Sequence, residues 1–258
     1  MTVQILIATM NRDDYSFLDK MNLWGNVIVV NQCDTERTDF YEGKNFQATI
    51  YSTKERGLSD SRNMALKYAC ADIVLTADDD ITYKNNAKEM ILKEFSEHLN
   101  ADIISFNIKP QNLKGRTVKA HKKWRKAPNN KYYSSVSLAY RLESLKRQGL
   151  AFDTRFGAGA IYESGEESLL LRQARKAHLR IFESPFCLAI VDFKNSTWFK
   201  GYDEKFFFDK GAWCAAAYPI AHILLKNYYL KFALCRKTPL SISSVYDFIK
   251  AGIKDFRQ

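Results

Sequence analysis

The stretch "DIVLTADDD", Asp72–Asp80, places three consecutive aspartates directly after a short apolar run. The run is rich in β-branched residues, which is typical of a buried strand. Adjacent carboxylates repel one another and lose hydration when buried, and a surface turn explains one aspartate better than three. A divalent cation would explain all three, because Mg²⁺ and Mn²⁺ bind carboxylate oxygens together with substrate phosphates. Since side chains alternate along an extended chain, Asp78 and Asp80 are expected to share one direction while Asp79 takes the other.

Strands and helices alternate through the first hundred residues. The expected strands are Val3–Thr9, Asn26–Asn31, Ala48–Ser52, Asp72–Ala77 and Asp102–Asn107, and the expected helices are Ser59–Cys70 and Asn86–Leu99. This alternation indicates an α/β fold with a mostly parallel central sheet flanked by helices. Such sheets bind ligands beyond the carboxyl ends of their strands, which is where the three aspartates lie.

The composition is that of a globular protein, with 46% hydrophobic and 26% charged residues in 258. Five dispersed cysteines without a Cys-x-x-Cys pair favour free thiols in a reducing compartment over disulfides or a zinc site. The apolar run at the N-terminus is too short for a signal peptide and reads as a first strand. We therefore expect a cytoplasmic protein. The four histidines are far apart in the sequence, and none is assigned to catalysis.

The net charge of +10 implies an anionic partner. Residues Lys109–Lys131 contain nine Lys or Arg and no acid, and Gly211–Tyr246 contain no acid either. The first segment is a solvated loop, or it guides a phosphate-bearing acceptor or touches anionic lipid. Nucleic acid is not an expected partner, because no nucleic-acid-binding module accompanies the basic residues.

Four motifs, in order, resemble the nucleotide-sugar half of family 2 glycosyltransferases with the GT-A fold. They are "ATMNR" (Ala8–Arg12), "VVNQCD" (Val29–Asp34), the Gly-Leu-Ser…Arg-Asn pattern of Gly57–Asn63, and the Asp-x-Asp pattern of Asp78–Asp80. The resemblance implies donor binding by Thr9, Asn11, Arg12, Gln32, Asp34, Gly57, Leu58, Ser59, Arg62, Asp78 and Asp79. It implies that Asp80 and Asp78 hold Mn²⁺ or Mg²⁺, and that the donor is a nucleotide sugar, a UDP- or dTDP-sugar.

A second block, Phe152–Leu179, resembles the acceptor half of the same family. There the second acid of a pair at a helix start is usually the general base, which implies Glu167 as base with Glu166 beside it. Ser164 as N-cap and two acids in a first helical turn are also an ordinary helix start. Both interpretations can hold together, because a helix start is a rigid mount for a carboxylate.

A third block, Ile190–Ala212, departs from the family pattern. Relatives often carry a histidine five residues before the threonine that corresponds to Thr197, and here that position is Asp192. The resemblance implies that Asp192 is either a third oxygen ligand of the metal or a site where the role has been lost.

The expected organisation is a GT-A catalytic domain over residues 1–210 and a C-terminal helical extension over 211–258. The nucleotide-sugar half of the domain covers 1–107 and the acceptor half 108–210. The extension includes an amphipathic segment with Leu224, Leu225 and Tyr228 on its apolar side, and a second helix at Ser241–Phe256. These helices are expected to lie on a membrane surface or to pack on the catalytic domain or another subunit as a homo-oligomer.

The sequence thus predicts a metal-dependent inverting glycosyltransferase that moves a sugar from a nucleoside-diphosphate sugar to a saccharide hydroxyl. The resemblance implies a lipid-linked acceptor in bacterial capsule or surface polysaccharide synthesis, at the inner face of the membrane. One alternative is a nucleotidyltransferase, although no glycine-rich phosphate loop follows the first strand. The other is a basic membrane- or nucleic-acid-binding protein that has lost catalysis.

Overall fold

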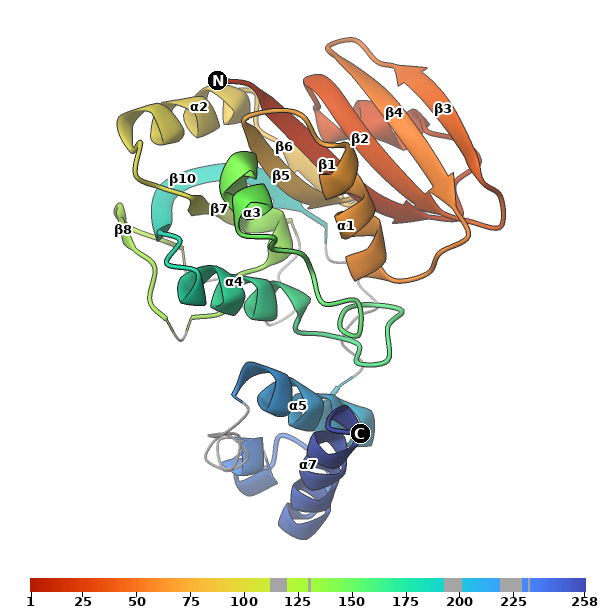
Figure 1. The fold of residues 1–258 in the computed structure, drawn as a ribbon, viewed down its shortest axis with the longest axis vertical. Coiled ribbons are helices and arrows are strands. Elements are labelled where there is room, and N and C mark those ends of the chain that lie inside the picture. Colours follow the sequence, from red (N-terminus) through yellow and green to blue (C-terminus); the bar gives the residue numbers. More distant parts are fainter. Residues whose placement is uncertain (112–119, 130, 193–200, 219–228, 232) are drawn as a thin grey trace.

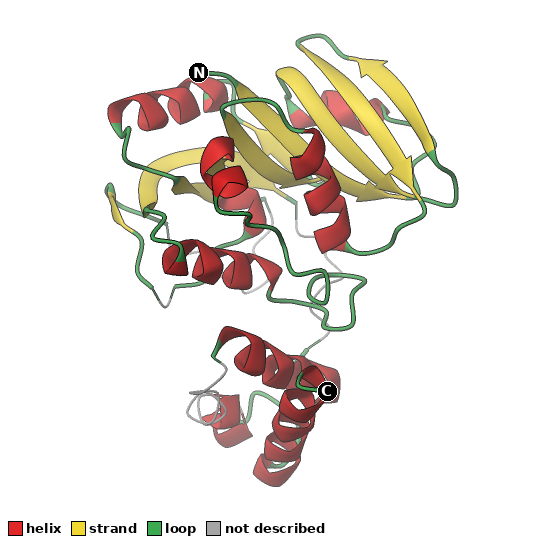
Figure 2. Cartoon of the chain, in the orientation of Figure 1, coloured by secondary structure: helices red, strands yellow, loops and turns green. Residues whose placement is uncertain are grey.

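The computed structural model describes residues 1–258 except 112–119, 130, 193–200, 219–228 and 232. Its centre is a ten-stranded sheet in the order β3-β4-β2-β1-β5-β9-β7-β10-β6, with β8 pairing to β10 (Figures 1 and 2). The strands are β1 Val3–Met10, β2 Gly25–Gln32, β3 Arg37–Glu42, β4 Phe46–Thr53, β5 Ile73–Asp78, β6 Ile81–Tyr83, β7 Ile103–Pro110, β8 Arg125–Lys126, β9 Leu138–Arg141 and β10 Ile181–Val191.

The predicted α/β fold with a central sheet flanked by helices is confirmed. Strands β4, β2, β1 and β5 pair in parallel, and so do β7 and β10. The antiparallel strands were not predicted: β9 lies between β5 and β7 and joins the two parallel parts. The five strands expected from apolar runs are all present, as β1, β2, β4, β5 and β7.

Two apolar cores cover the two faces of the sheet. One face packs against the short helix η1 (Ser16–Met21) and α2 (Ala87–Glu97). The other packs against α1 (Leu58–Tyr68), α3 (Leu142–Arg147) and α4 (Glu166–Lys176). The two helices predicted in the first hundred residues, at Ser59–Cys70 and Asn86–Leu99, correspond to α1 and α2. Because both faces are covered, the open positions for a ligand are the strand ends.

The carboxyl ends of β1, β2 and β5 meet at one edge of the sheet. In the parallel register, Ala8 of β1 pairs with Asp78 of β5, and Met10 pairs with Gln32 of β2. This register brings the first motifs and the aspartates together, although about 70 residues separate them in the sequence.

A smaller helical unit follows the sheet domain and lies beside α4 (Figure 1). It contains α5 (Glu204–Ala217), capped by the Asp203 carboxylate, and α7 (Ile242–Phe256), capped by Ser241. The two helices cross closely: a Cβ on Gly211 would lie 2.1 Å from the Ile249 carbonyl oxygen.

The short helix η2 (Ser135–Ser137) belongs to the sheet domain.

The predicted domain boundary after residue 210 falls inside α5. We propose that the helical unit begins instead at Asp203, because that residue caps α5. The buried residues of α5 also pack in one cluster with those of α7. The predicted helix at Ser241–Phe256 is α7. No helix among the described residues combines the length and the apolar character needed to cross a bilayer. Leu224, Leu225, Tyr228 and Thr197 lie outside the described residues, as does part of the basic Lys109–Lys131 segment.

Candidate active site

A cleft of about 1310 Å³ opens beyond the carboxyl end of β5. Its walls come from the end of β5, the start of α1, residue 129, residues 131–137, α4 and α5. Two groups of predicted residues line it together: Leu58, Arg62, Asp78 and Asp80 from the nucleotide-sugar half, and Glu166 and Glu167 from the acceptor half.

The three aspartates divide as the alternation of side chains predicts. Asp78 and Asp80 line the cleft, whereas the Asp79 carboxylate accepts hydrogen bonds from Thr9 Oγ1 at 2.6 Å and from Arg12 Nη2 at 2.8 Å. Asp79 thus joins the end of β5 to the end of β1. Asp78 ends β5, and Asp79 and Asp80 lie in the turn that follows it.

Asp80 is the aspartate without a compensating partner. Its Oδ1 is buried and has no hydrogen-bond partner among the described residues. Burial, and then the charges of Asp78 and Asp79, raise the pKa of Asp80 to about 7. The backbone N–H of Asp192 donates to the Asp80 carbonyl oxygen at 3.0 Å, so Asp192 lies beside it. A buried carboxylate oxygen that no protein donor satisfies is the kind of group that a cation would complete.

Arg62 connects the two halves of the cleft. Its guanidinium is 3% exposed and donates to Asp78 Oδ1 at 3.2 Å and to Glu166 Oε1 at 2.9 Å. It also donates to Ser135 Oγ at 2.7 Å. Burial alone would lower the pKa of Arg62, but the carboxylates of Asp78 and Glu166 raise it above its ordinary value. The side chain is therefore a fixed cation between two acids.

Replacing Arg62 by Met is expected to lower the free energy of unfolding by about 3–5 kcal/mol, because it leaves two acids without their shared buried partner. Urea unfolding measures this loss. Arg12→Met is the matched control, since Arg12 pairs with Asp79 but is 42% exposed, and exposed pairs contribute at most about 1 kcal/mol. Equal losses in both variants would contradict a central role for Arg62.

Glu166 and Glu167 begin α4 but have different surroundings. The Glu166 carboxylate is occupied by Arg62 and by the backbone N–H of Gly165 at 2.9 Å. No hydrogen bond or ion pair joins the Glu167 carboxylate to another side chain among the described residues. Burial, and then the charge of Glu166, raise the pKa of Glu167 to about 8. Glu167 thus has the perturbed pKa that is common at reactive carboxylates, whereas Glu166 is bound to Arg62 and to the start of the helix.

The profile of the family described as Glycosyl transferase family 2 matches residues 25–163, which is more than half of the chain. The chain belongs to glycosyl transferase family 2. The predicted family and GT-A fold are thereby confirmed, and with them the class of enzyme, a glycosyltransferase. No curated protein matches the sequence.

Solved structures of S. aureus TarS share the fold. TarS 1–349 with UDP-GlcNAc has a TM-score of 0.63 at 18% identity, over 84% of this chain and 66% of that one. TarS 1–349 without a named ligand has a TM-score of 0.64 at 16% identity, over 99% and 92%. A longer TarS structure gives 0.63 at 17%, over 100% of this chain and 54% of that one. The chain therefore spans just over half of the longer TarS structure.

The other predicted donor residues lie along the neighbouring strand ends of the glycosyltransferase sheet. Asn11 has a positive φ of 51° and its N–H donates to the Gln32 carbonyl oxygen at 2.9 Å. The Gln32 side chain in turn accepts from the Gly57 N–H at 2.7 Å. Asp34 pairs with Arg56 at the surface. Sequence analysis missed Asn31, whose side chain holds both the N–H and the carbonyl oxygen of Arg12.

Ser59 connects α1 to the loop before α4 and does not line the cleft. Its side chain is fully buried and donates to the Phe156 carbonyl oxygen at 2.5 Å. The Leu58 N–H donates to the Ala158 carbonyl oxygen at 2.9 Å. The start of α1 is therefore tied to the glycine-containing loop that precedes α4, and a Cβ on Gly157 would lie 3.1 Å from Ser59 Oγ.

Helix α5 fixes the start of α4, which sequence analysis did not foresee. The Asp209 carboxylate accepts from the Glu163 N–H at 2.9 Å, Lys210 Nζ donates to Ser164 Oγ at 3.0 Å, and Trp213 Nε1 donates to Ser168 Oγ at 2.8 Å. These contacts flank the two glutamates on both sides. Ser164 was the expected N-cap of α4; that expectation is wrong, because the cap is Gly165 with a φ of 116°.

Gly165→Ala is expected to lower the rate of glycosyl transfer by about 100-fold, because a displacement near 1 Å at a catalytic group has that effect. A Cβ at this position would lie 2.5 Å from Trp213 Cδ1, so α4 and α5 would have to separate. Initial rates with a nucleotide-sugar donor measure the change. Gly149→Ala is the matched control: its φ is also positive, at 59°, but its Cβ would meet nothing within 4 Å. Similar rates in both variants would contradict the idea that the contacts between α5 and α4 position the start of α4.

Two further features, one in the cleft and one beside it, were not indicated by the sequence. Tyr132 lines the cleft with 60% of its surface exposed, and the nearby charge of Glu167 raises its pKa. Glu183, which is fully buried, accepts hydrogen bonds from Lys131, Tyr133 and Arg125 at 2.6–2.8 Å. Glu183 therefore anchors the end of the basic segment beside the cleft. A lone glutamate on an unpredicted strand gave no signal of this role.

Proposed function

We propose that the protein is a metal-dependent, inverting glycosyltransferase that uses a nucleoside-diphosphate sugar. One observation carries the proposal: Arg62 joins Asp78 to Glu166, so the acids assigned to the donor and the acids assigned to the acceptor face the same cleft. A transfer reaction needs both sets within reach of one sugar.

The residues present fit a divalent cation at Asp80 and Asp78. The orphaned Oδ1 of Asp80 supplies one hard oxygen ligand, and the Asp78 carboxylate faces the same cleft. No group of three or more His, Cys, Asp or Glu able to hold a metal exists within the described part of the chain. The proposal therefore rests on the two aspartates, and Mg²⁺ and Mn²⁺ take one or two carboxylates and complete their shell with water and substrate phosphates. Asp192 is proposed as an outer carboxylate beside Asp80.

When bound, the cation would neutralise the negative charge that develops on the departing diphosphate. Arg62 adds a fixed positive charge from the protein at the same side of the cleft. We propose that the ends of β1 and β2, with Thr9, Asn11, Arg12, Gln32 and Asp34, receive the nucleoside. The TarS complex with UDP-GlcNAc supports a UDP-sugar as the donor to test first.

Glu167 is the proposed general base. It would accept the proton of the attacking acceptor hydroxyl, a contribution of about 10²–10⁴-fold in rate. Its raised pKa suits that exchange, as does the absence of a bonded side chain in the described part of the structure, whereas Glu166 is bonded to Arg62. A single attack from the side opposite the leaving group inverts the anomeric carbon, so no glycosyl-enzyme intermediate is proposed.

The proposed acceptor is a hydroxyl of a saccharide, lipid-linked and belonging to a surface polysaccharide. The excess of basic residues supports an acceptor or a membrane surface that is anionic. A peripheral position at the inner face of the membrane and self-association through the C-terminal helices follow as parts of the same proposal.

The proposed function is tested by thermal shift and by donor hydrolysis. UDP-, GDP- and dTDP-sugars are screened with and without Mn²⁺, and the release of nucleoside diphosphate is measured. We expect one nucleotide series to stabilise the protein only with metal present and to be hydrolysed slowly. A protein that binds anions but never releases nucleoside diphosphate would be an inactive binder, which overturns the proposal.

A further inference from the structure

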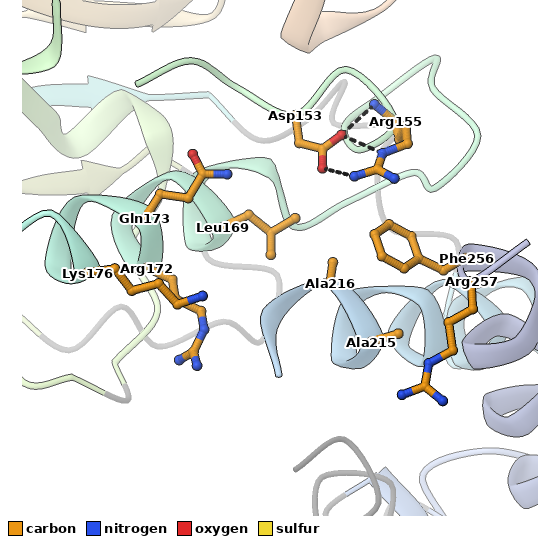
Figure 3. A pocket seen from close by; sticks show the side chains of 10 residues that line it. All are labelled: Asp153, Arg155, Leu169, Arg172, Gln173, Lys176, Ala215, Ala216, Phe256 and Arg257. Carbon is orange, nitrogen blue, oxygen red and sulfur yellow. Dashed lines mark hydrogen bonds and ion pairs between the residues drawn. The ribbon is translucent and has the colours of Figure 1, made fainter. Parts of the chain in front are cut away.

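A second, smaller pocket lies between α4 and the C-terminal helices, outside the part of the cleft that holds the acids. Its volume is about 330 Å³, and it is formed by the loop before α4, the outer side of α4, and the ends of α5 and α7 (Figure 3). Nothing in the proposed transfer reaction uses it.

The charge of this pocket is strongly positive. Among its ten lining residues are four cations, Arg155, Arg172, Lys176 and Arg257, and one acid, Asp153. The Asp153 carboxylate is taken up by Arg155 through hydrogen bonds of 2.9 and 2.7 Å. The loop before α4 is therefore neutral as a pair, and an anion in the pocket would meet net positive charge from α4 and from the residue that follows α7.

Two of the guanidinium groups are held in place by aromatic rings. Arg172 stacks on the Tyr218 ring at 3.6 Å, and Arg155 stacks on the Phe256 ring at 4.3 Å. Arg172 Nε is buried without a hydrogen-bond partner in the described part of the structure. Planar, preorganised guanidinium groups match phosphate oxygens well, because their donors lie in a fixed fork.

The floor of the pocket is apolar. It consists of Leu169 from α4, Ala215 and Ala216 from α5, and the ring of Phe256 from α7, which Figure 3 shows between the basic side chains. A basic rim over an apolar floor suits a phosphate that carries an organic group better than a free inorganic ion.

The pocket and the cleft share part of their wall on α4. Arg172 and Lys176 line both. Arg172 follows Glu167 by five residues, which is about 8 Å along a helix axis at 1.5 Å per residue. The two side chains are also turned about 140° apart around the helix, at about 100° per residue. A molecule whose hydroxyl reached Glu167 and whose chain passed around α4 would meet Arg172 and Lys176, which line both spaces.

We propose that this pocket binds a phosphate group carried by the acceptor, next to the saccharide that receives the sugar. The assignment to the acceptor rests on the proposed function, whereas phosphate binding itself does not. The phosphate comes from one of two sources: the phosphate of a lipid carrier, or a phosphodiester within a water-soluble acceptor chain.

Calorimetric titration with hexyl phosphate tests this, with the donor site saturated by UDP and Mg²⁺. Hexyl glucoside serves as the uncharged probe with the same tail. We expect hexyl phosphate to bind about 10-fold more tightly than hexyl glucoside, since hydrogen bonds to charged groups contribute about 1.5–3 kcal/mol. Glycerol 3-phosphate separates the sources: weaker binding than hexyl phosphate indicates a lipid phosphate, and equal binding indicates a phosphodiester chain.

The double variant Lys176→Gln/Arg257→Gln is expected to weaken hexyl phosphate binding by about 10-fold or more, because two rim cations are lost. Both side chains are exposed, so the fold should persist, and a melting curve checks this. Arg147→Gln removes an exposed charge on α3 and should change the affinity less than 2-fold, a bound set by surface charge effects of about 0.4 kcal/mol.

Unchanged binding in the double variant, or equal binding of hexyl phosphate and hexyl glucoside, would overturn the phosphate site. The two proposals fail separately. Phosphate binding without any donor hydrolysis would overturn the proposed function and leave the site, and donor hydrolysis without phosphate binding would do the reverse.

Discussion

Glu167→Gln is expected to lower the rate of sugar transfer by about 10²–10⁴-fold while leaving the affinity for the donor nearly unchanged. The amide keeps the size of the side chain but cannot accept the hydroxyl proton. Initial rates with a saturating acceptor, together with calorimetric titration of UDP and Mn²⁺, separate the two quantities.

The pH profile gives a second readout for Glu167. A base must be deprotonated to act, and burial with the charge of Glu166 raises the pKa of Glu167 to about 8 in the free enzyme. The kcat/KM of the wild-type protein should therefore rise with pH and level off above about 8, and Glu167→Gln should lose this rise.

The same titration affects stability in the opposite sense. The folded protein holds the Glu167 proton more tightly than the unfolded chain, whose carboxyl has the ordinary pKa of 4.5. This carboxyl therefore lowers stability as pH rises from about 4.5 to about 8, and Glu167→Gln should flatten that decline.

Glu166→Gln is the matched control for Glu167. Its carboxylate anchors Arg62 and the Gly165 N–H, so its loss should reduce stability more than Glu167→Gln does. If Glu166→Gln alone abolished the alkaline rise in rate, the roles of the two glutamates would be reversed.

The second large effect is expected for Asp80→Asn. The variant should lose about 100-fold or more in Mn²⁺-dependent affinity for UDP, since a bound cation contributes several kcal/mol at such a site. Without metal, its affinity for UDP should equal that of the wild type. Titrations of UDP with and without Mn²⁺ measure both values.

Asp80→Asn should also raise the melting temperature of the metal-free protein. The wild-type carboxylate is buried beside two other acids and one of its oxygens has no donor, so a neutral amide relieves a cost that only the cation removes. Asp79→Asn is the control: its carboxylate is bonded to Thr9 and Arg12, so it should lose stability and less than 10-fold in UDP affinity. A larger loss of UDP affinity in Asp79→Asn than in Asp80→Asn would contradict a metal site at Asp80.

Local patterns in the sequence were enough to predict much of the nucleotide-sugar half. Apolar runs predicted β1, β2, β4, β5 and β7, because buried parallel strands are continuous and apolar. Asp78 and Asp80 line the cleft and Asp79 bonds elsewhere, as predicted, but strand alternation is an incomplete reason: β5 ends at Asp78, and Asp79 and Asp80 lie in the turn that follows it.

The arrangement of the acceptor half depends on contacts that local patterns do not encode. Strand β9 is only four residues long and pairs with β5 and β7, which are distant in sequence. Arg62 and Glu166 are 104 residues apart, and the local sequence around either residue does not indicate that they pair.

The role of α5 was missed for a related reason. Its residues read as the start of an apolar tail, so the predicted boundary divided the helix. In the structure, Asp209, Lys210 and Trp213 form hydrogen bonds with Glu163, Ser164 and Ser168, which lie on either side of Glu166 and Glu167 at the start of α4. Which polar side chain of a helix meets which loop is decided by tertiary packing alone.

The most direct test of a divalent cation at Asp78 and Asp80 is anomalous diffraction from crystals soaked with Mn²⁺ and UDP. We predict a manganese peak in contact with the Asp80 carboxylate, with the diphosphate of UDP on its other side and Glu167 across the cleft. A well-occupied UDP whose diphosphate lies away from Asp78 and Asp80, with no manganese between those carboxylates, would contradict the metal-dependent mechanism.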